Sequence, residues 1–194
     1  MKKKVIRELY KSKRIGLSAV QKEKMNDLML IQFQRLKMDI PGLIMTYSAI
    51  EKLNEFDPQL ITDYCFFKNP DQVLFFPVLT QMDDLISVVV NDTTEFKTNK
   101  FGIDEPVNGL PMFPEEIDLV IVPLLAFDKN GFRVGYGKGY YDKFLKECRE
   151  DVIKIGFSYF DPVDFISDIN AFDVKLDCCI TPQNIHKFNE QLNN

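Results

Sequence analysis

The sequence predicts a single α/β domain in three layers, with helices on both faces of a mostly parallel sheet. Near-continuous apolar runs alternate with helical patterns, which is typical of parallel strands buried on both sides. The chain has 194 residues, the length of one domain, and 45% of them are hydrophobic, which is enough for a substantial core. No internal repeat or low-complexity tract divides it, so we expect residues 1–194 to form one domain.

Two helices are predicted at the start of the chain. Val5, Ile6 and Leu9 have helical spacing within a basic segment, which indicates a first helix at about residues 1–14. Ser18 and Gln21 have the spacing of a capping box, so a second helix is expected to start there and to continue to about residue 38. The Pro-Gly pair at 41–42 ends this segment.

The middle of the chain alternates strand and helix patterns. The run "LIMTYSAI" at 43–50 predicts a buried strand, and 57–67 predicts a helix with Asp57 at its N-cap and Pro58 at its first position. Strand-like runs follow at 73–79 and 85–90. The Pro- and Gly-rich connection at 97–116 shows little periodicity and is long for a compact domain, and such loops are often functional.

The last third carries the most apolar strand pattern, at 117–127. A helix is expected from about Tyr140 to Cys148, and later strands at 152–159 and 176–181. In open parallel sheets, ligands bind beyond the carboxyl ends of the strands. The glycine-rich segment between the 117–127 strand and the 140–148 helix is therefore well placed to form a site.

The charge distribution is uneven, and it restricts the partners we expect. The net charge is −5, but residues 1–24 carry nine Lys/Arg and two Asp/Glu, about +7, which leaves about −12 for the remainder. An acidic chain is a poor non-specific binder of nucleic acid, so we expect no nucleic-acid partner. The basic segment can bind a small polyanion or form a solvated helix face, and charge alone leaves both open.

Other features bear on compartment and chemistry. No run of 18 apolar residues exists and the N-terminus lacks a signal-peptide h-region, so we expect no membrane partner and a cytoplasmic location. The four cysteines form no C-x-x-C pair, which favours a reducing compartment without disulfides or a zinc site. His186 is the only histidine, which argues against a His-based triad or a His-rich metal site.

The stretch "GFRVGYGKGYYDKFL" at 131–145 is the strongest candidate site. Glycines let backbone N–H groups approach a ligand closely, and a following helix N-terminus adds partial positive charge, so together they can cradle an anion. Arg133 and Lys138 add full charges, and Asp142 can either cap the helix or hold Mg²⁺. Neither the dinucleotide fingerprint nor the Walker pattern fits. From the residues alone, phosphate binding and a purely structural turn both remain open.

A longer composite motif resembles the 5-formyltetrahydrofolate cyclo-ligase family. It comprises Pro123, Phe127-Asp128, Gly131-Phe132-Arg133, and Gly135 through Asp142. Weaker similarities extend over nearly the whole chain, in "KKVIR" before "RIGLS", "NEFDP", "FGIDEP" and "FDVKLDCCIT". Leu124 departs from the pattern, because the family usually has glycine there.

The resemblance implies an activity. It implies that 5-formyltetrahydrofolate is converted to 5,10-methenyltetrahydrofolate with ATP as co-substrate and Mg²⁺ as cofactor. The formyl oxygen is phosphorylated, N10 then closes the ring, and phosphate leaves. It further implies reduced folate and ATP as partners, and we expect a monomer.

The resemblance also assigns roles to individual residues. It implies ATP binding by Lys3, Arg7, Arg133, Gly135, Tyr136, Gly137, Lys138, Gly139, Tyr140 and Tyr141. Of these, Arg133 and Lys138 are the expected catalytic groups, and Tyr140 is also expected to contact the folate together with Glu55. Asp142 and Asp173 are the expected magnesium ligands, with Asp168 and Asp177 as alternatives to Asp173.

Two functions of other classes stay open beside the cyclo-ligase. The domain can be a nucleotide- or polyanion-binding module without catalysis, using the same glycine-rich cradle. It can also be a sugar-phosphate isomerase-like enzyme on a related α/β sheet, which would not consume ATP. Consumption of ATP that depends on 5-formyltetrahydrofolate separates the three.

Overall fold

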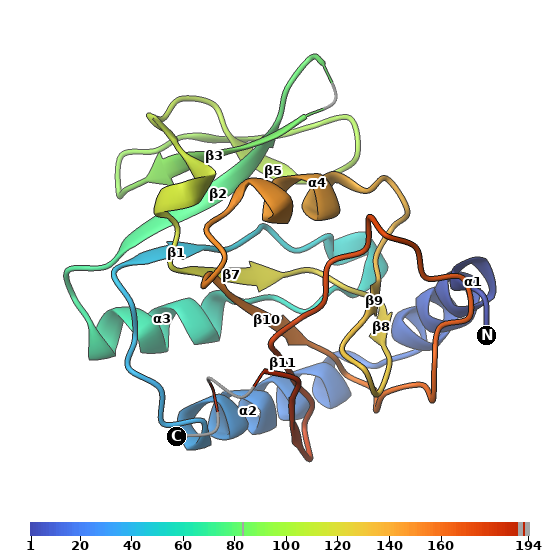
Figure 1. The fold of residues 1–194 in the computed structure, drawn as a ribbon. Helices are drawn as coiled ribbons and strands as arrows, with labels where there is room; N and C mark the ends of the chain where they lie inside the picture. Colours follow the sequence, from blue (N-terminus) through green and yellow to red (C-terminus); the bar gives the residue numbers. More distant parts are fainter. Residues whose placement is uncertain (83, 190–191, 193–194) are drawn as a thin grey trace.

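A central mixed sheet organises the protein, as the computed structural model in Figure 1 shows for residues 1–82, 84–189 and 192. The strand order is β12-β11-β10-β7-β1-β2-β3-β6, and the four inner pairs from β11 to β2 are parallel. The outer pairs are antiparallel. The strands are β1 (Leu43–Met45), β2 (Val73–Leu79), β3 (Leu85–Val90), β6 (Pro111–Met112), β7 (Leu119–Val122), β10 (Ile153–Phe157), β11 (Cys178–Ile180) and β12 (Ile185–Lys187).

Helices cover both faces of this sheet, so the predicted three-layer α/β architecture is confirmed. α2 (Ala19–Arg35) and α3 (Gln59–Lys68) lie on one face and α4 (Tyr140–Glu147) lies on the other (Figure 1). Alternate residues of β7 serve the two sides: Leu119 and Ile121 join the core under α2 and α3, whereas Val120 and Val122 join the core under α4. Because every residue of β7 is buried, the strand reads as a continuous apolar run.

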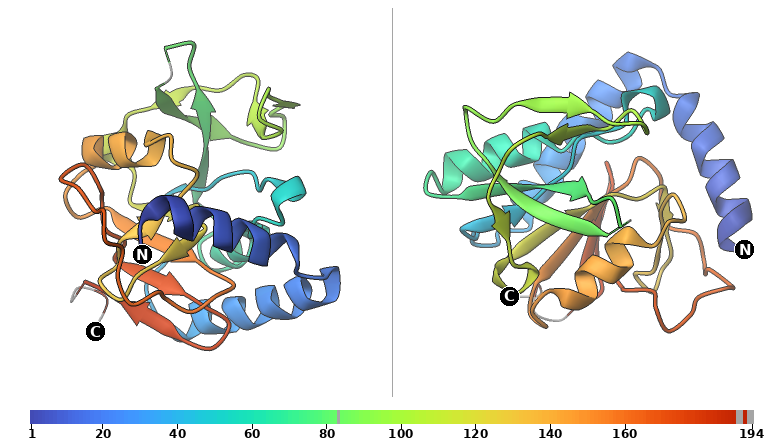
Figure 2. Two further views of the ribbon diagram at one scale, coloured as in Figure 1. Left: turned by 90° about the vertical axis from the view of Figure 1, so that its right-hand side faces the viewer. Right: turned by 90° about the horizontal axis from the view of Figure 1, so that it is seen from above.

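The predicted basic helix is confirmed as α1 (Lys3–Ile15), and it lies outside the three layers (Figures 1 and 2). It packs on a small hairpin of β8 (Ala126–Phe127) and β9 (Arg133–Val134), where Ile6 and Tyr10 are buried with Val134. This hairpin follows the end of β7, so α1 lies near the carboxyl ends of the parallel strands. The basic segment therefore borders the edge of the sheet at which ligands bind.

The helix starts follow local capping chemistry. Ser18 forms the predicted capping box, since its hydroxyl accepts the Gln21 N–H at 3.2 Å and the Gln21 side chain accepts the Ser18 N–H at 2.9 Å. α2 ends at Arg35, about three residues earlier than expected. α3 starts later than expected: Pro58 lies just before the helix, and Asp57 accepts the Gln59 N–H at 3.0 Å.

The strand predicted at 117–127 is two separate elements. β7 ends at Val122, because Pro123 cannot continue the ladder, and the chain then turns into the β8–β9 hairpin. The side chain of Leu124 packs against β10 at Gly156, where the absence of a side chain leaves room for it. A Cβ on Gly156 would lie 2.4 Å from Leu124 Cδ2.

Three other connections also differ from the prediction. The 43–50 strand stops at Met45, and a short 3₁₀ helix η1 (Glu51–Leu53) follows. The 97–116 connection contains strand β5 (Asp104–Pro106), which pairs with β4 (Phe96–Thr98), and also β6 and a second 3₁₀ helix η2 (Pro114–Glu116). β12 has no counterpart in the prediction. None of the helices in the described part of the chain has the length and apolar character needed to cross a bilayer.

Candidate active site

A cavity of about 700 Å³ opens at the carboxyl ends of β1 and β7. Its walls come from α1, the segments that follow β1 and β7, strands β2 and β3, the β4–β5 hairpin, and the loop between β9 and α4. Every site residue predicted from the sequence lines this one cavity: Lys3, Arg7, Glu55, Arg133, Gly135, Tyr136, Gly137, Lys138, Gly139, Tyr140, Tyr141, Asp142 and Asp173.

The glycine loop presents its backbone to the cavity and to α1. Gly137 and Gly139 have φ values of 93° and 76°, in the left-handed region that side chains disfavour, and α4 begins directly after Gly139. A Cβ on Gly137 would lie 2.9 Å from the Arg7 guanidinium carbon. Arg7 Nε donates to the Gly135 carbonyl at 2.9 Å, so the basic helix and the glycine loop meet directly.

Lys138 is the exposed cation at the centre of this loop. No hydrogen bond or ion pair joins its ammonium to any residue that the structure describes. Its positive charge is therefore not paired with a carboxylate of the described residues, and it is available to an anionic ligand.

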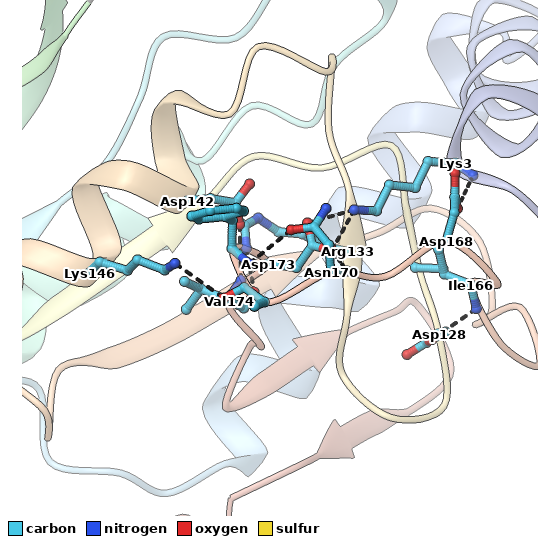
Figure 3. Close-up of polar contacts among 12 residues, drawn as sticks. Lys3, Asp128, Arg133, Asp142, Lys146, Ile166, Asp168, Asn170, Asp173 and Val174 are labelled. Carbon is cyan, nitrogen blue, oxygen red and sulfur yellow. Dashed lines mark hydrogen bonds and ion pairs between the residues drawn. The ribbon is translucent and has the colours of Figure 1, made fainter.

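Arg133 and Asp142 form a pair beneath the loop (Figure 3). Asp142 Oδ1 lies 3.1 Å from Arg133 Nη2 and accepts the Val174 N–H at 3.0 Å, and Arg133 Nη1 donates to the Val174 carbonyl at 2.6 Å. Burial lowers the pKa of Arg133, and the charge of Asp142 opposes that shift. Both residues therefore hold the 165–177 loop against α4, a structural role that the sequence reading did not anticipate.

Lys3 and Asp173 form a second pair in the same cavity (Figure 3). Lys3 Nζ lies 2.6 Å and 2.5 Å from the two carboxylate oxygens of Asp173, and Asp173 Oδ2 also accepts the Asn170 N–H at 2.7 Å. The alternative aspartates lie elsewhere. Asp168 accepts the backbone N–H of Lys3 at 2.7 Å, and Asp177 pairs with Lys154 at 2.8 Å without lining this cavity.

Asp142 and Asp173 both line the cavity and carry the hard oxygen donors that Mg²⁺ prefers. Mg²⁺ in nucleotide sites usually takes one or two protein carboxylates, with phosphate oxygens and waters as the other ligands. Among the described residues, no group of three or more His, Cys, Asp or Glu is arranged to hold a metal without further ligands.

A buried network forms the far end of the cavity. Glu55 Oε1 accepts the Tyr136 hydroxyl at 2.7 Å, and Glu55 Oε2 accepts the Ile50 N–H at 2.9 Å. Arg14, in the last turn of α1, donates to the Tyr136 hydroxyl and to the Leu53 carbonyl, the latter at 2.7 Å. Burial raises the pKa of Glu55, whereas the nearby Arg14 charge lowers it.

Arg14 was missed from the sequence, although one signal pointed to it. Positions 3, 7, 10 and 14 recur at helical spacing, so Lys3, Arg7, Tyr10 and Arg14 share one face of α1. Helical periodicity does not distinguish an exposed arginine from a buried one. Arg14 was therefore not separated from the other basic residues of the segment, for which a solvated face was one of two interpretations. Its side chain is only 3% exposed.

Two tyrosines at the start of α4, Tyr140 and Tyr141, also line the cavity. The hydroxyl of Tyr141 is buried and finds no hydrogen-bond partner among the residues that the structure describes. Burial raises the pKa of Tyr141 and of Tyr136, so both phenols are neutral near neutral pH. Tyr141 can therefore offer a hydrogen bond to a ligand.

The cavity also has an apolar wall, and the sequence reading assigned none of its residues to the site. The "FGIDEP" similarity was a signal for part of it, because that segment forms the turn and the second strand of the β4–β5 hairpin. Glu105 of β5 accepts the Leu79 N–H at 3.3 Å, which holds the hairpin beside β2. The wall consists of Pro77, Leu79, Leu85, Phe101, Ile103 and Phe172.

Comparison with known proteins relates the chain to one family. Residues 55–182 match the 5-formyltetrahydrofolate cyclo-ligase family. The chain is 27% identical over 186 residues to the 5-formyltetrahydrofolate cyclo-ligase of Mycoplasma pneumoniae, covering 94% of this chain and 100% of the relative. It is 28% identical over 176 residues to the enzyme of the same name from Mycoplasma genitalium, covering 90% of this chain and 94% of the relative.

The fold agrees with that match. The NMR structure of the Aquifex aeolicus 5,10-methenyltetrahydrofolate synthetase superposes with a TM-score of 0.79 at 27% identity, over 97% of this chain and 93% of that one. The match covers the glycine loop, Glu55 and both cavity aspartates within residues 55–182. The chain belongs to the 5-formyltetrahydrofolate cyclo-ligase family and, with it, to the ligase enzymes.

Proposed function

We propose that this protein makes 5,10-methenyltetrahydrofolate from 5-formyltetrahydrofolate with consumption of ATP, and that the reaction requires Mg²⁺. One observation supports this proposal above the others. An anion cradle at Gly135–Gly139, a buried carboxylate, Glu55, and an apolar wall line the same cavity. This arrangement suits a phosphate group at one end and a folate ring at the other.

The phosphate end is built for positioning and charge neutralisation. A formamide oxygen is a poor leaving group, and transfer of the γ-phosphoryl group to it makes phosphate the leaving group when N10 attacks. Phosphoryl transfer depends mainly on alignment and electrostatic stabilisation. The backbone of the glycine loop, Lys138, Arg7 and Lys3 supply both, and Arg133 contributes a buried positive charge.

The metal belongs at the same end. Asp142 and Asp173 would hold Mg²⁺, which supplies charge neutralisation for the phosphate oxygens when bound. In the structure, both carboxylates are paired with cations, Asp142 with Arg133 and Asp173 with Lys3.

The folate end uses one carboxylate and apolar surface. An ionised Glu55 accepts paired N–H donors of the kind found on a pterin edge. Phe101 and the apolar wall offer apolar surface for the ring. Tyr140 borders the same space.

The chemistry needs no histidine or thiolate. His186 lies outside the residues that line the cavity. Burial raises the pKa of the thiols of Cys65, Cys148 and Cys178 to about 12, so they are not nucleophiles near neutral pH.

An absorbance assay for the methenyl product tests the proposal, run with and without ATP and with ADP release measured in parallel. We expect product only when 5-formyltetrahydrofolate, ATP and Mg²⁺ are all present, with one ADP per product. Binding of ATP without product would favour the non-catalytic nucleotide-binding module. Folded protein that forms neither product nor ADP under any of these conditions contradicts the cyclo-ligase mechanism.

A further inference from the structure

We propose that Arg14 is a positioning residue that aims the Glu55 carboxylate at the folate ring through the hydroxyl of Tyr136. This inference rests on the proposed role of Glu55 at the folate end of the cavity. Arg14 does not line the cavity, so it acts through the two residues that do.

The guanidinium of Arg14 sits at the junction of three segments. Nε donates to the Leu53 carbonyl at 2.7 Å and Nη1 donates to the Leu124 carbonyl at 3.3 Å. Nη2 donates to the Tyr136 hydroxyl, and Nη1 lies 3.8 Å from Glu55 Oε1. The planar fork of arginine is thereby fixed in direction, which a lysine at this position would not achieve.

Tyr136 is the link between Arg14 and Glu55. Its hydroxyl accepts from Arg14 and donates to Glu55 Oε1 at 2.7 Å, so the proton of the phenol is directed towards the carboxylate. Its ring also lies near two cations of α1, with Lys11 Nζ 5.5 Å and Arg14 Cζ 5.7 Å from the ring centroid. The tyrosine of the glycine loop is thus oriented by α1, and the carboxylate is oriented by the tyrosine.

Arg14 is also the one cation that acts on Glu55 among the described residues. The titratable groups around this carboxylate are Arg14 from α1, Tyr136 from the glycine loop, Tyr141 from α4, Tyr47 after β1, and Tyr159 after β10. The four phenols have raised pKa values and are neutral. Glu55 is 4% exposed, so its ionised form depends on Arg14 and on the two hydrogen bonds that it accepts.

The first measurement follows the ionisation of Glu55 in the folded protein without any ligand. Carboxyl ¹³C signals of labelled glutamates are titrated by NMR, and the Glu55 signal is assigned by its loss in Glu55→Gln. In Arg14→Met we expect the Glu55 midpoint to rise by about 1–3 pH units, because an opposite charge at this distance is removed. Arg35→Met is the matched control, since Arg35 is an exposed arginine in the last turn of α2, and it should leave the midpoint unchanged.

The second measurement asks whether this ionisation serves folate binding. In Arg14→Met the KM for 5-formyltetrahydrofolate should rise by about 10-fold or more, with the KM for ATP changed much less. The acid limb of the folate KM profile should move to higher pH by the same amount as the Glu55 midpoint. A purely structural role for Arg14 would change stability without moving either pH profile.

Two further variants separate charge from direction and guard against misfolding. Arg14→Lys keeps the charge but loses the fork, so the Glu55 midpoint should stay near its original value while the folate KM rises. Tyr136→Phe keeps the Arg14 bonds to both carbonyls but removes the bridging hydroxyl, and it should raise the Glu55 midpoint and the folate KM together. If Arg14→Met does not fold, Tyr136→Phe decides the proposal on the same two readouts.

The outcomes distinguish failure of this inference from failure of the proposed function. An unchanged folate KM in Glu55→Gln would remove Glu55 from the folate site, and with it the positioning role. A strong defect in Glu55→Gln, together with an unchanged folate KM profile in Arg14→Met or Tyr136→Phe, would leave the proposed function intact and overturn the role of Arg14.

Discussion

At the residue scale, the cavity is organised as pairs of opposite charges. Two pairs, Lys3 with Asp173 and Arg133 with Asp142, each join an expected phosphate-binding cation to an expected metal-binding carboxylate. Glu55 is arranged differently, because its nearest cation is 3.8 Å away and a phenol intervenes. Lys138 has no such pair among the described residues, which leaves it the exposed positive group of the loop.

Asp142→Asn tests the proposed metal ligand. The amide keeps one oxygen for the Val174 N–H but loses the negative charge that Arg133 and Mg²⁺ both require. We expect kcat to fall by about 10-fold or more and the Mg²⁺ requirement to rise. The measurement is kcat against magnesium concentration for both proteins.

The matched control for that experiment is Asp27→Asn, an exposed carboxylate on α2 away from the cavity. It should reproduce the curve of the original protein. If Asp142→Asn gives the same magnesium curve as well, Asp142 is not a ligand, and its part in the site is limited to holding Arg133 and Val174.

Gly137→Ala tests the backbone of the glycine loop. The substitution forces a side chain into φ 93°, which costs about 1–2 kcal/mol, and its Cβ would press on the Arg7 guanidinium. We therefore expect both a lower free energy of unfolding and weaker ATP binding, measured by chemical denaturation and by calorimetry.

Gly135→Ala separates these two effects within the same loop. Nothing lies within 4 Å of a Cβ at Gly135, and its φ is not in the left-handed region, so the free energy of unfolding should change by less than about 1 kcal/mol. Its ATP affinity should fall only if the nucleotide approaches the backbone there. A Gly137→Ala protein with unaltered ATP affinity would mean that the loop is a structural turn.

At the scale of elements, α1 is the component that spans the cavity. Lys3 and Arg7 lie at the phosphate end, and Arg14 reaches the Glu55 end from the last turn of the same helix. Ile6 and Tyr10 are buried among residues of the β8–β9 region, which fixes the helix in place. One amphipathic helix thus sets the distance between the two ends of the site.

Combined Lys3→Ala and Arg7→Ala changes test the phosphate end of α1. Each removes a charge-assisted contact to the expected phosphates, so the KM for ATP should rise by about 10-fold or more and depend less on ionic strength. The KM for folate should change little. Lys4→Ala is the control, because Lys4 is exposed on the same helix and does not line the cavity. An ATP KM unaffected at every salt concentration would make this face of α1 a solvated surface.

At the scale of the whole molecule, the parallel centre of the sheet is far better buried than the lobe that closes the cavity. β7 lies between β10 and β1 with all four residues buried, whereas every residue of β4 is exposed in a two-stranded hairpin. The candidate active site lies between a well-buried core and an exposed hairpin.

Amide hydrogen exchange measures this difference. Protection should be highest in β7, β10 and β1, where opening requires disruption of the core, and lowest in β4 and β5, which can open locally. Exchange followed by NMR or mass spectrometry resolves these segments. Amides of β4 and β5 as slow as those of β7 would show that the hairpin is part of the same cooperative unit.

Much of the architecture could be predicted from the chain itself, for reasons of local chemistry. Alternation of apolar runs with helical patterns determined the α/β class, because parallel strands must be apolar on both faces. The Ser18 capping box and the helical spacing of apolar residues in α1 depend only on neighbouring residues. Both could therefore be predicted, and both are confirmed. The glycine loop was placed correctly directly before α4, since left-handed glycines and the start of a helix are encoded within a few residues. It follows β9 and not the strongest strand, β7.

What tertiary structure decided depends on contacts between distant segments. β7 and β8 were predicted as one strand, because both are apolar. Their separation lies in their partners, since β7 pairs with β1 and β10 whereas β8 pairs with β9. Arg14 could not be told from a surface cation until Leu53, Leu124 and Tyr136 surrounded it. Of Asp168, Asp173 and Asp177, only Asp173 is among the residues that line the cavity, and sequence patterns do not record the direction of a loop side chain.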